Sequence, residues 1–200
     1  MYRIFGLGNF GEEYQDTPHN IGRQVLEIFL KDNDNDFKKG RRDKKRNSQI
    51  FQGEMFGENL ELIFLENFMN NSGDAFNGIF SKNNEKEKEK IIIIQDDIDL
   101  PFGEFRISFN RGDGGHNGIK DIIKKIKTKK IIRIRIGVCP LDFFGKCRKP
   151  KSGQAVNKYL VEKQLGRKYT QKYQDYSEKV KEILKEIFKH SKKSAMNKFN

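Results

Sequence analysis

The chain has 200 residues, a length that suits one domain whose core needs no disulfide or metal. Its 40 Lys and Arg residues outnumber 28 Asp and Glu, and the net charge of +12 favours a polyanionic partner, nucleic acid before a membrane surface. No apolar run approaches membrane-spanning length, and Cys139 and Cys147 lack the spacing of a metal site. Residues 1–8 are already typical of a strand, so we expect neither a signal peptide nor an Arg/Ser-rich presequence. We therefore expect a protein without membrane contact in a reducing compartment, either the cytoplasm or an organelle. Nothing in the sequence demands an oligomer, so a monomer is expected.

The first predicted strand, residues 2–7, leads into a glycine-rich turn, GLGNFG. This spacing also occurs in dinucleotide-binding turns, but no acidic residue follows a second strand at the place where it would bind a ribose. A nucleotide-dependent enzyme is therefore a remote alternative. His19 and Asn20 come directly before a helical pattern of apolar residues that begins at Ile21. Both side chains are expected at a helix start, where free N–H groups face a cleft.

The next elements are a hairpin and a helix. A basic stretch, residues 38–46, is compatible with a solvated loop, and strands at 49–56 and 60–65 follow it. The second strand leads to the segment FMNNSG, whose Asn70 lies at a strand-to-helix junction, and the helix after it is expected to include Ile79 and Phe80. Residues 83–90 form a charged connector.

The centre of the chain is the segment 91–118. Its four consecutive isoleucines, without polar alternation, predict a strand buried on both faces of the sheet. The strand ends in an acidic cluster that contains Asp96, at the place where open α/β sheets bind ligands. The neighbouring Asp97 and Asp99 are expected to support turns, and no second histidine has metal-ligand spacing, so we predict no metal. A glycine-rich turn around His116 closes the segment, and a structural role is favoured for this histidine over that of a second base.

The last part of the chain carries most of the basic charge. Strands are predicted at 105–109 and 131–138 and helices at 119–126 and 177–188. Arg133 and Arg135 alternate with isoleucines and are expected on a solvent-facing side of their strand. Apolar residues show no regular spacing in the stretch 141–153, which is a candidate mobile segment. Residues 190–200 are expected to form a disordered basic tail. From 143 to 200 there are 16 Lys and Arg against 5 Asp and Glu, which places a basic face here.

Four ordered segments carry a resemblance to a known family. GLGNFGEEYQDTPHNIG, FMNNSG, IIIIQDDIDLPFGEFR and GGHNGIKDI, followed by RIRIGVCP, resemble the bacterial-type peptidyl-tRNA hydrolases over residues 4–161. The resemblance implies a phosphorylase/hydrolase-like α/β fold, with a single domain at 1–200 built on a twisted mixed β-sheet flanked by helices. It also implies hydrolysis of the ester between a peptide and the terminal ribose of tRNA, with no metal and no cofactor.

The resemblance assigns roles to single residues. It makes His19 the catalytic base, Asp96 its carboxylate partner, and Asn9 a contact at the scissile end of the substrate. It places Tyr14, Phe68, Asn70 and Asn117 along the groove for the tRNA terminus and the peptide. These residue types suit the chemistry, because a histidine can take a proton from water near neutral pH and amides can both donate and accept hydrogen bonds.

The sequence departs from the family pattern near the proposed base. Phe10 stands where Pro is usual, Pro18 where Arg is usual, and Gln95 where His is common, while the segment before Phe68 lacks the usual Lys-Pro start. None of these changes removes a residue with an assigned role, but they leave the shape of the loop around His19 open. The alternative function is a catalytically inactive RNA-binding relative of the same fold. With a tRNA substrate, lysines and arginines of the tail or of residues 120–130 are expected to contact phosphates.

Overall fold

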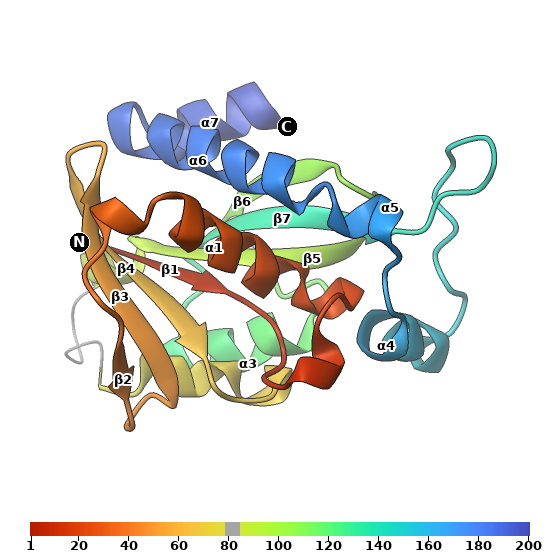
Figure 1. Ribbon diagram of the computed structural model, residues 1–200, viewed down its shortest axis with the longest axis horizontal. Helices are drawn as coiled ribbons and strands as arrows, with labels where there is room; N and C mark the ends of the chain where they lie inside the picture. Colours follow the sequence, from red (N-terminus) through yellow and green to blue (C-terminus); the bar gives the residue numbers. More distant parts are fainter. Residues whose placement is uncertain (79–84) are drawn as a thin grey trace.

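Four parallel strands form the middle of a seven-stranded sheet in the computed structural model, which describes residues 1–78 and 85–200 (Figure 1). The parallel strands are β4 (Glu58–Leu65), β1 (Tyr2–Gly6), β5 (Ile91–Pro101) and β7 (Ile132–Cys139). Antiparallel strands complete the two edges, namely β3 (Ser48–Met55) and β2 (Arg41–Asp43) beside β4, and β6 (Phe105–Phe109) beside β7. The predicted twisted mixed sheet flanked by helices is confirmed.

The isoleucine run at the start of β5 is the centre of this sheet. β5 pairs with β1 on one side and β7 on the other, with Ile92 opposite both Ile4 and Ile132. Ile92 and Ile94 point into one apolar core, and Ile91 and Ile93 point into the other. The prediction of a strand buried on both faces is therefore correct, because helices cover both sides of the sheet.

Helices cover the two faces unequally. α1 (Ile21–Asp32) and α6 (Tyr173–Lys189) pack against each other over one face, and α3 (Asn117–Ile126) lies on the opposite face together with the 3-10 segment η4 (Met69–Phe76) (Figure 1). The helix expected after FMNNSG is thus a 3-10 segment in its described part, and Ile79 and Phe80 lie outside the described residues. The remaining helices are α2 (Glu85–Lys88), α4 (Gly153–Glu162), α5 (Arg167–Thr170) and α7 (Lys192–Phe199), and short 3-10 turns are η1 (Glu12–Tyr14), η2 (Pro18–Asn20) and η3 (Asp34–Asp36).

A close backbone contact fixes the start of α1 on the sheet. A Cβ added to Gly22 would lie 2.3 Å from the carbonyl oxygen of Ile94, so any other residue would push the helix away from β5. The Arg23 N–H also donates to the carbonyl of Leu7 at 2.9 Å. The segment that carries His19 is therefore held against the strand that carries Asp96.

The expected disordered tail at 190–200 is a helix in the structure. α7 buries Ala195 in the core that contains α6, and Met196 and Phe199 pack against the same core. The side chain of Asn200 accepts from the Ile107 N–H at 2.7 Å and donates to the Ile107 carbonyl at 3.0 Å, which covers the exposed edge of β6. The sequence did not show this, because an eight-residue helix owes its stability to tertiary contacts.

Two further expectations differ from the structure. Cys139 and Cys147 form a disulfide, which removes the reason for inferring a reducing compartment from them. The same bond ties part of the supposedly mobile 141–153 segment to the end of β7, and α4 begins at Gly153. The charged connector 83–90 includes the four-residue α2, whereas residues 83 and 84 are outside the described part. Among the described helices, none is long and apolar enough to cross a membrane.

Candidate active site

Three of the expected site residues meet at the carboxyl ends of the parallel strands. Asn9 follows β1, Asp96 is the middle residue of β5 and lies beyond the end of β1, and His19 is the middle residue of η2. η2 starts at Pro18, where the missing N–H costs no hydrogen bond, and the preceding Thr17 has the extended backbone that a residue before proline prefers. The substitution of Pro at position 18 is thus compatible with the short helix that presents His19.

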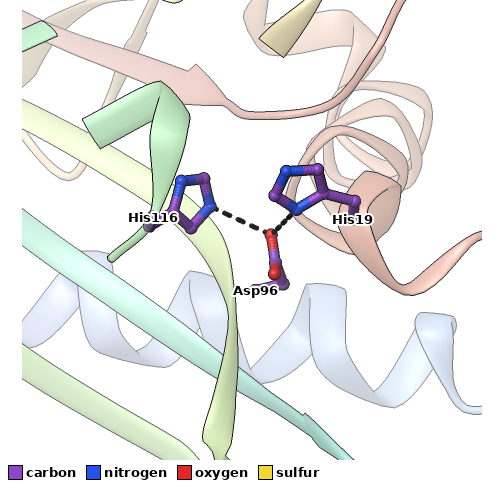
Figure 2. A group of neighbouring side chains, drawn as sticks. All are labelled: His19, Asp96 and His116. Carbon is purple, nitrogen blue, oxygen red and sulfur yellow. Dashed lines mark hydrogen bonds and ion pairs between the residues drawn. The ribbon is translucent and has the colours of Figure 1, made fainter. Parts of the chain in front are cut away.

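Two histidines share one carboxylate oxygen (Figure 2). His19 Nδ1 lies 2.8 Å from Asp96 Oδ1, and His116 Nε2 lies 3.0 Å from the same atom. The two imidazole rings are 4.9 Å apart between centroids and inclined by 37°. Asp96 is 2% exposed and His19 6%, so the contact between them is shielded from water.

The charge of Asp96 sets the tautomers of its partners. Burial raises the pKa of Asp96, but the positive charge that His19 and His116 can carry and their hydrogen bonds lower it more, so the pKa lies well below the ordinary value of an aspartate. An ionised carboxylate accepts hydrogen bonds, which puts the proton of neutral His19 on Nδ1. Nε2 of His19 then has a free lone pair, and it has no hydrogen-bond partner among the described residues.

His116 has a capping role as well. The Ile119 N–H donates to His116 Nδ1 at 3.4 Å at the start of α3, which leaves Nε2 to donate to Asp96. The sequence favoured a structural role for His116 over that of a second base; the contact with Ile119 is structural, whereas the contact with Asp96 is of the same kind as that of His19. What the sequence missed is the direct contact with Asp96, because the two residues are twenty positions apart and no spacing rule connects them.

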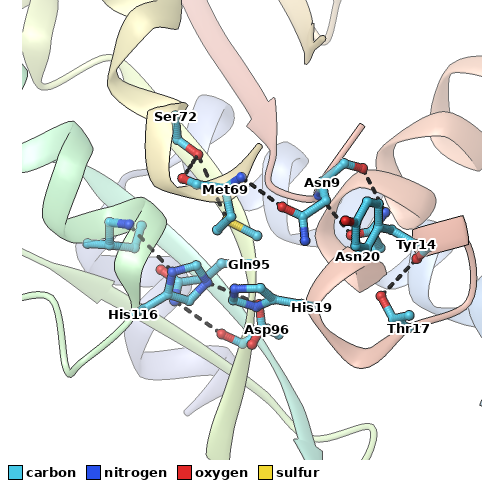
Figure 3. Close-up of polar contacts among 11 residues, drawn as sticks. Asn9, Tyr14, Thr17, His19, Asn20, Met69, Ser72, Gln95, Asp96 and His116 are labelled. Carbon is cyan, nitrogen blue, oxygen red and sulfur yellow. Dashed lines mark hydrogen bonds and ion pairs between the residues drawn. The ribbon is translucent and has the colours of Figure 1, made fainter. Parts of the chain in front are cut away.

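A network of amides holds Asn9 beside His19 (Figure 3). The Asn9 N–H donates to Asn20 Oδ1 at 2.8 Å, and Asn20 Nδ2 donates back to the Asn9 carbonyl at 2.9 Å. The Asn9 side-chain oxygen accepts from the Met69 N–H at 2.8 Å. With its oxygen occupied, the amide of Asn9 has its Nδ2 left as a donor on the side that faces His19 (Figure 3). The sequence placed Asn20 at the helix start but gave it no role.

The histidine pair opens into a cleft of about 1000 Å³. Its lining includes His19, Asp96, His116 and Asn117, and a set of cationic side chains, Arg106, Arg111, Arg133, Arg135, Lys149 and Lys151. Arg133 and Arg135 do not face open solvent as expected: Arg133 is 4% exposed, and Arg135 pairs with Asp97 at 2.8 Å. The strand alternation was correct, but the turn before α3 encloses the polar face of β7 together with the end of β5.

The other expected site residues lie at the margins of this cluster. Asn117 begins α3, is exposed and lines the cleft. Tyr14, Phe68 and Asn70 are outside the cleft lining, and the rings of Tyr14 and Phe68 meet edge to face at 6.2 Å. Phe68 is 58% exposed, and it is connected to the cluster through its neighbour Met69, which donates to Asn9. The structure thus groups His19, Asp96 and Asn9 closely and leaves an aromatic surface beside them.

The same cluster offers three ligand atoms to a cation. One nitrogen from each of His19 and His116 and one oxygen of Asp96 lie within 4.8 Å of one another. Both nitrogens, however, point at a single carboxylate oxygen at hydrogen-bond distance. In a metal site the nitrogens and the oxygen would converge on the ion from a distance of about 2 Å each. The geometry therefore fits a hydrogen-bonded base better than a metal centre.

Comparisons with known proteins agree on one family. The sequence matches the model of the peptidyl-tRNA hydrolase family over residues 3–200. A peptidyl-tRNA hydrolase of Dehalococcoides mccartyi is 41% identical over 138 residues, which are 69% of this chain and 70% of the relative. One of Koribacter versatilis is 34% identical over 202 residues, covering 100% of this chain and 92% of the relative. The crystal structure of the Acinetobacter baumannii peptidyl-tRNA hydrolase aligns with a TM-score of 0.81 and 27% identity, covering 100% of this chain and 94% of that one.

The fold and the cleft, taken with these comparisons, define a hydrolase built on an α/β sheet. The family model covers nearly the whole chain, and the full-length relative shares a third of its residues. The chain belongs to the peptidyl-tRNA hydrolase family.

Proposed function

We propose that the protein hydrolyses the ester that joins a peptide to the terminal ribose of tRNA, with His19 as the general base. The observation that carries this proposal is the buried contact between His19 Nδ1 and Asp96 Oδ1 at 2.8 Å, which leaves Nε2 facing a cleft. Hydrolysis of an ester needs an activated water and a donor for the developing oxyanion, and the site offers groups of both kinds.

The reaction follows from these positions. His19 Nε2 takes a proton from a water whose oxygen attacks the ester carbonyl carbon. The imidazolium that forms is stabilised by the ionised Asp96, and the Asn9 amide donates to the carbonyl oxygen as negative charge develops there. The bond from the carbonyl carbon to the ribose oxygen then breaks, and the proton on His19 passes to that oxygen. The products are a peptide with a free carboxylate and a tRNA with its terminal hydroxyl restored.

The surroundings of the base fit a nucleic-acid substrate. Of the cationic side chains in the cleft lining, Arg106, Arg111 and Lys151 are exposed and can attract phosphates without regard to base sequence. Asn117 and the aromatic surface of Tyr14 and Phe68 are available to the tRNA terminus and the peptide, and Asn70 is exposed beside them. We further propose that the enzyme acts as a monomer in the cytoplasm, the compartment of translation, and contacts tRNA phosphates through its basic residues.

The test is deacylation of an N-acetylated aminoacyl-tRNA in the presence of a chelator. We expect hydrolysis well above the rate in buffer, and little hydrolysis of the same tRNA with an unblocked aminoacyl group. Activity that disappears with the chelator and returns with a metal would overturn the metal-independent mechanism. No activity with any blocked substrate would instead favour the inactive RNA-binding alternative, which the intact pair of His19 and Asp96 speaks against.

A substitution separates catalysis from binding. His19→Ala is expected to lower kcat by roughly 10²–10⁴-fold, the usual contribution of a general base, while tRNA affinity changes little. His190→Ala is the matched control, because His190 is an exposed histidine at the end of α6. If His19→Ala lost tRNA affinity and kept kcat, the role assigned to His19 would be wrong.

A further inference from the structure

A small hairpin leaves the sheet at the same edge as the proposed active site. It spans residues 140–148, directly after β7, and we call it the Phe hairpin. β7 runs parallel to β5, so its carboxyl end lies at the same edge as Asp96. In Figure 1 the segment between β7 and α4 stands out from the body of the protein.

The Phe hairpin is held in one shape by several bonds. The Cys139–Cys147 disulfide closes it, and Leu141 and Cys147 form an antiparallel bridge. The Asp142 carboxylate accepts from the N–H groups of Phe144 and Lys146, each at 2.9 Å, and from Arg148 Nε at 2.9 Å. Gly145 has a φ of +76°, a conformation that glycine adopts without strain. A loop with this many internal bonds loses little entropy when it binds a partner.

Two aromatic rings stand at the tip of this rigid loop. Phe143 is 96% exposed and Phe144 82% exposed, and their rings contact each other edge to face at 5.6 Å. Neither residue belongs to the two apolar cores of the described chain. The rings therefore contribute nothing to the packing of the fold, and an exposed aromatic pair on a fixed support indicates a contact surface.

The charges around the Phe hairpin specify the kind of partner. Lys146 and Lys151 have no ion-pair partner in the part of the chain that the structure describes, and Lys149 and Lys151 also line the catalytic cleft. The surface thus combines flat apolar rings with positive charge, and it is continuous with the cleft. Single-stranded nucleic acids are recognised by this combination, in which bases stack on aromatic rings while cations follow the phosphates.

We propose that Phe143 and Phe144 stack on unpaired bases at the 3′ end of the tRNA substrate. The inference rests on the proposed function, because that substrate brings a single-stranded terminus to the cleft. Stacking needs no particular base, so the contact favours an unpaired tail over a paired end without selecting a sequence. The Asp142 contacts with Phe144, Lys146 and Arg148 keep the rings in position before the substrate arrives.

The test measures binding of the full-length protein to an acceptor-stem minihelix that carries no ester. One minihelix has an unpaired 3′ tail with 2-aminopurine in it, and the other lacks the tail. The double variant Phe143→Leu, Phe144→Leu keeps apolar side chains without aromatic faces, and Phe143→Tyr, Phe144→Tyr keeps the faces. Stacking of 2-aminopurine on an aromatic ring quenches its fluorescence, and we expect the Leu pair to lose this quenching. We also expect the Leu pair to bind the tailed minihelix roughly tenfold more weakly, which is at the lower end of the affinity losses caused by removing a stacking ring.

The Tyr pair should bind the tailed minihelix like the natural protein, and all forms should bind the tailless minihelix equally. Equal binding of the tailed minihelix by the Leu pair would overturn the inference. The inference would also be overturned if the Leu pair bound RNA like the natural protein but lost binding to vesicles of anionic phospholipid. That result would assign the surface to a membrane. Deacylation of N-acetyl-aminoacyl-tRNA, measured in parallel, separates the two proposals. If the natural protein is active but the Leu pair binds the tailed minihelix equally well, only the stacking proposal is refuted. If the natural protein is inactive, the proposed function is refuted.

Discussion

Replacing Asp96 by Asn removes the one charge that both histidines of the proposed active site contact. The carboxylate oxygen accepts from His19 at 2.8 Å and from His116 at 3.0 Å, and it is 2% exposed. A hydrogen bond to a charged group contributes about 1.5–3 kcal/mol, roughly twice the value of a neutral one. If the His19 imidazolium loses about 3 kcal/mol of stabilisation in the transition state, kcat falls about 100-fold. An amide can also donate to His19 Nδ1 and place the proton on the wrong nitrogen, which adds to the loss.

The assay is deacylation of N-acetyl-aminoacyl-tRNA at saturating and limiting substrate. We expect Asp96→Asn to lower kcat at least 100-fold with little change in KM, since Asp96 is buried behind the histidines and is not expected to contact the tRNA. Asp34→Asn is the matched control, because Asp34 is exposed in η3 and its carboxylate has no hydrogen-bond or ion-pair partner among the described residues. A folded Asp96→Asn protein with kcat within a few-fold of the natural enzyme would refute the role given to this carboxylate.

Two other predictions follow from the same contacts. Asn9→Asp keeps an oxygen for the Met69 N–H but removes the amide donor. We expect kcat to fall roughly 100-fold, because about 3 kcal/mol of oxyanion stabilisation is lost. An unchanged kcat would show that Asn9 serves only to position Met69. Because the pKa of Asp96 is lowered on folding, its contribution to stability is present above the unfolded pKa of about 3.9 and is lost as the pH falls from there toward the lower folded value. Urea unfolding across this range should show a shallower acid loss in Asp96→Asn, and identical pH slopes would contradict the lowered pKa.

The sequence predicted well wherever a local pattern had one structural solution. Four isoleucines in a row can be buried only between two covered faces, and β5 has this environment. Because parallel strands place their carboxyl ends at one edge, Asp96 and the loop after β1 could be expected to meet there. The apolar period of α6 likewise survives in the structure, where Val180, Ile183 and Leu184 are fully buried.

Predictions failed where the environment of a segment depends on distant parts of the chain. The residues at 190–200 are polar enough to suggest disorder, yet α7 is held by the core of α6 and by the backbone of Ile107. Arg133 alternates with isoleucines as a solvent-facing residue would, yet it is buried. Only the folded chain shows that this side of β7 lines a cleft and does not face open solvent.

The sequence by itself determined the sheet class, the central buried strand, the family resemblance and the identity of His19, Asp96 and Asn9 as candidates, because each depends on neighbouring residues or on ordered motifs. The tertiary structure alone decided that His116 shares the carboxylate of Asp96, that Asn20 holds Asn9, and that a disulfide fixes the Phe hairpin beside the cleft. No sequence pattern connects the two residues of any of these contacts. Their hydrogen-bond geometry is set only after the strands and helices have packed.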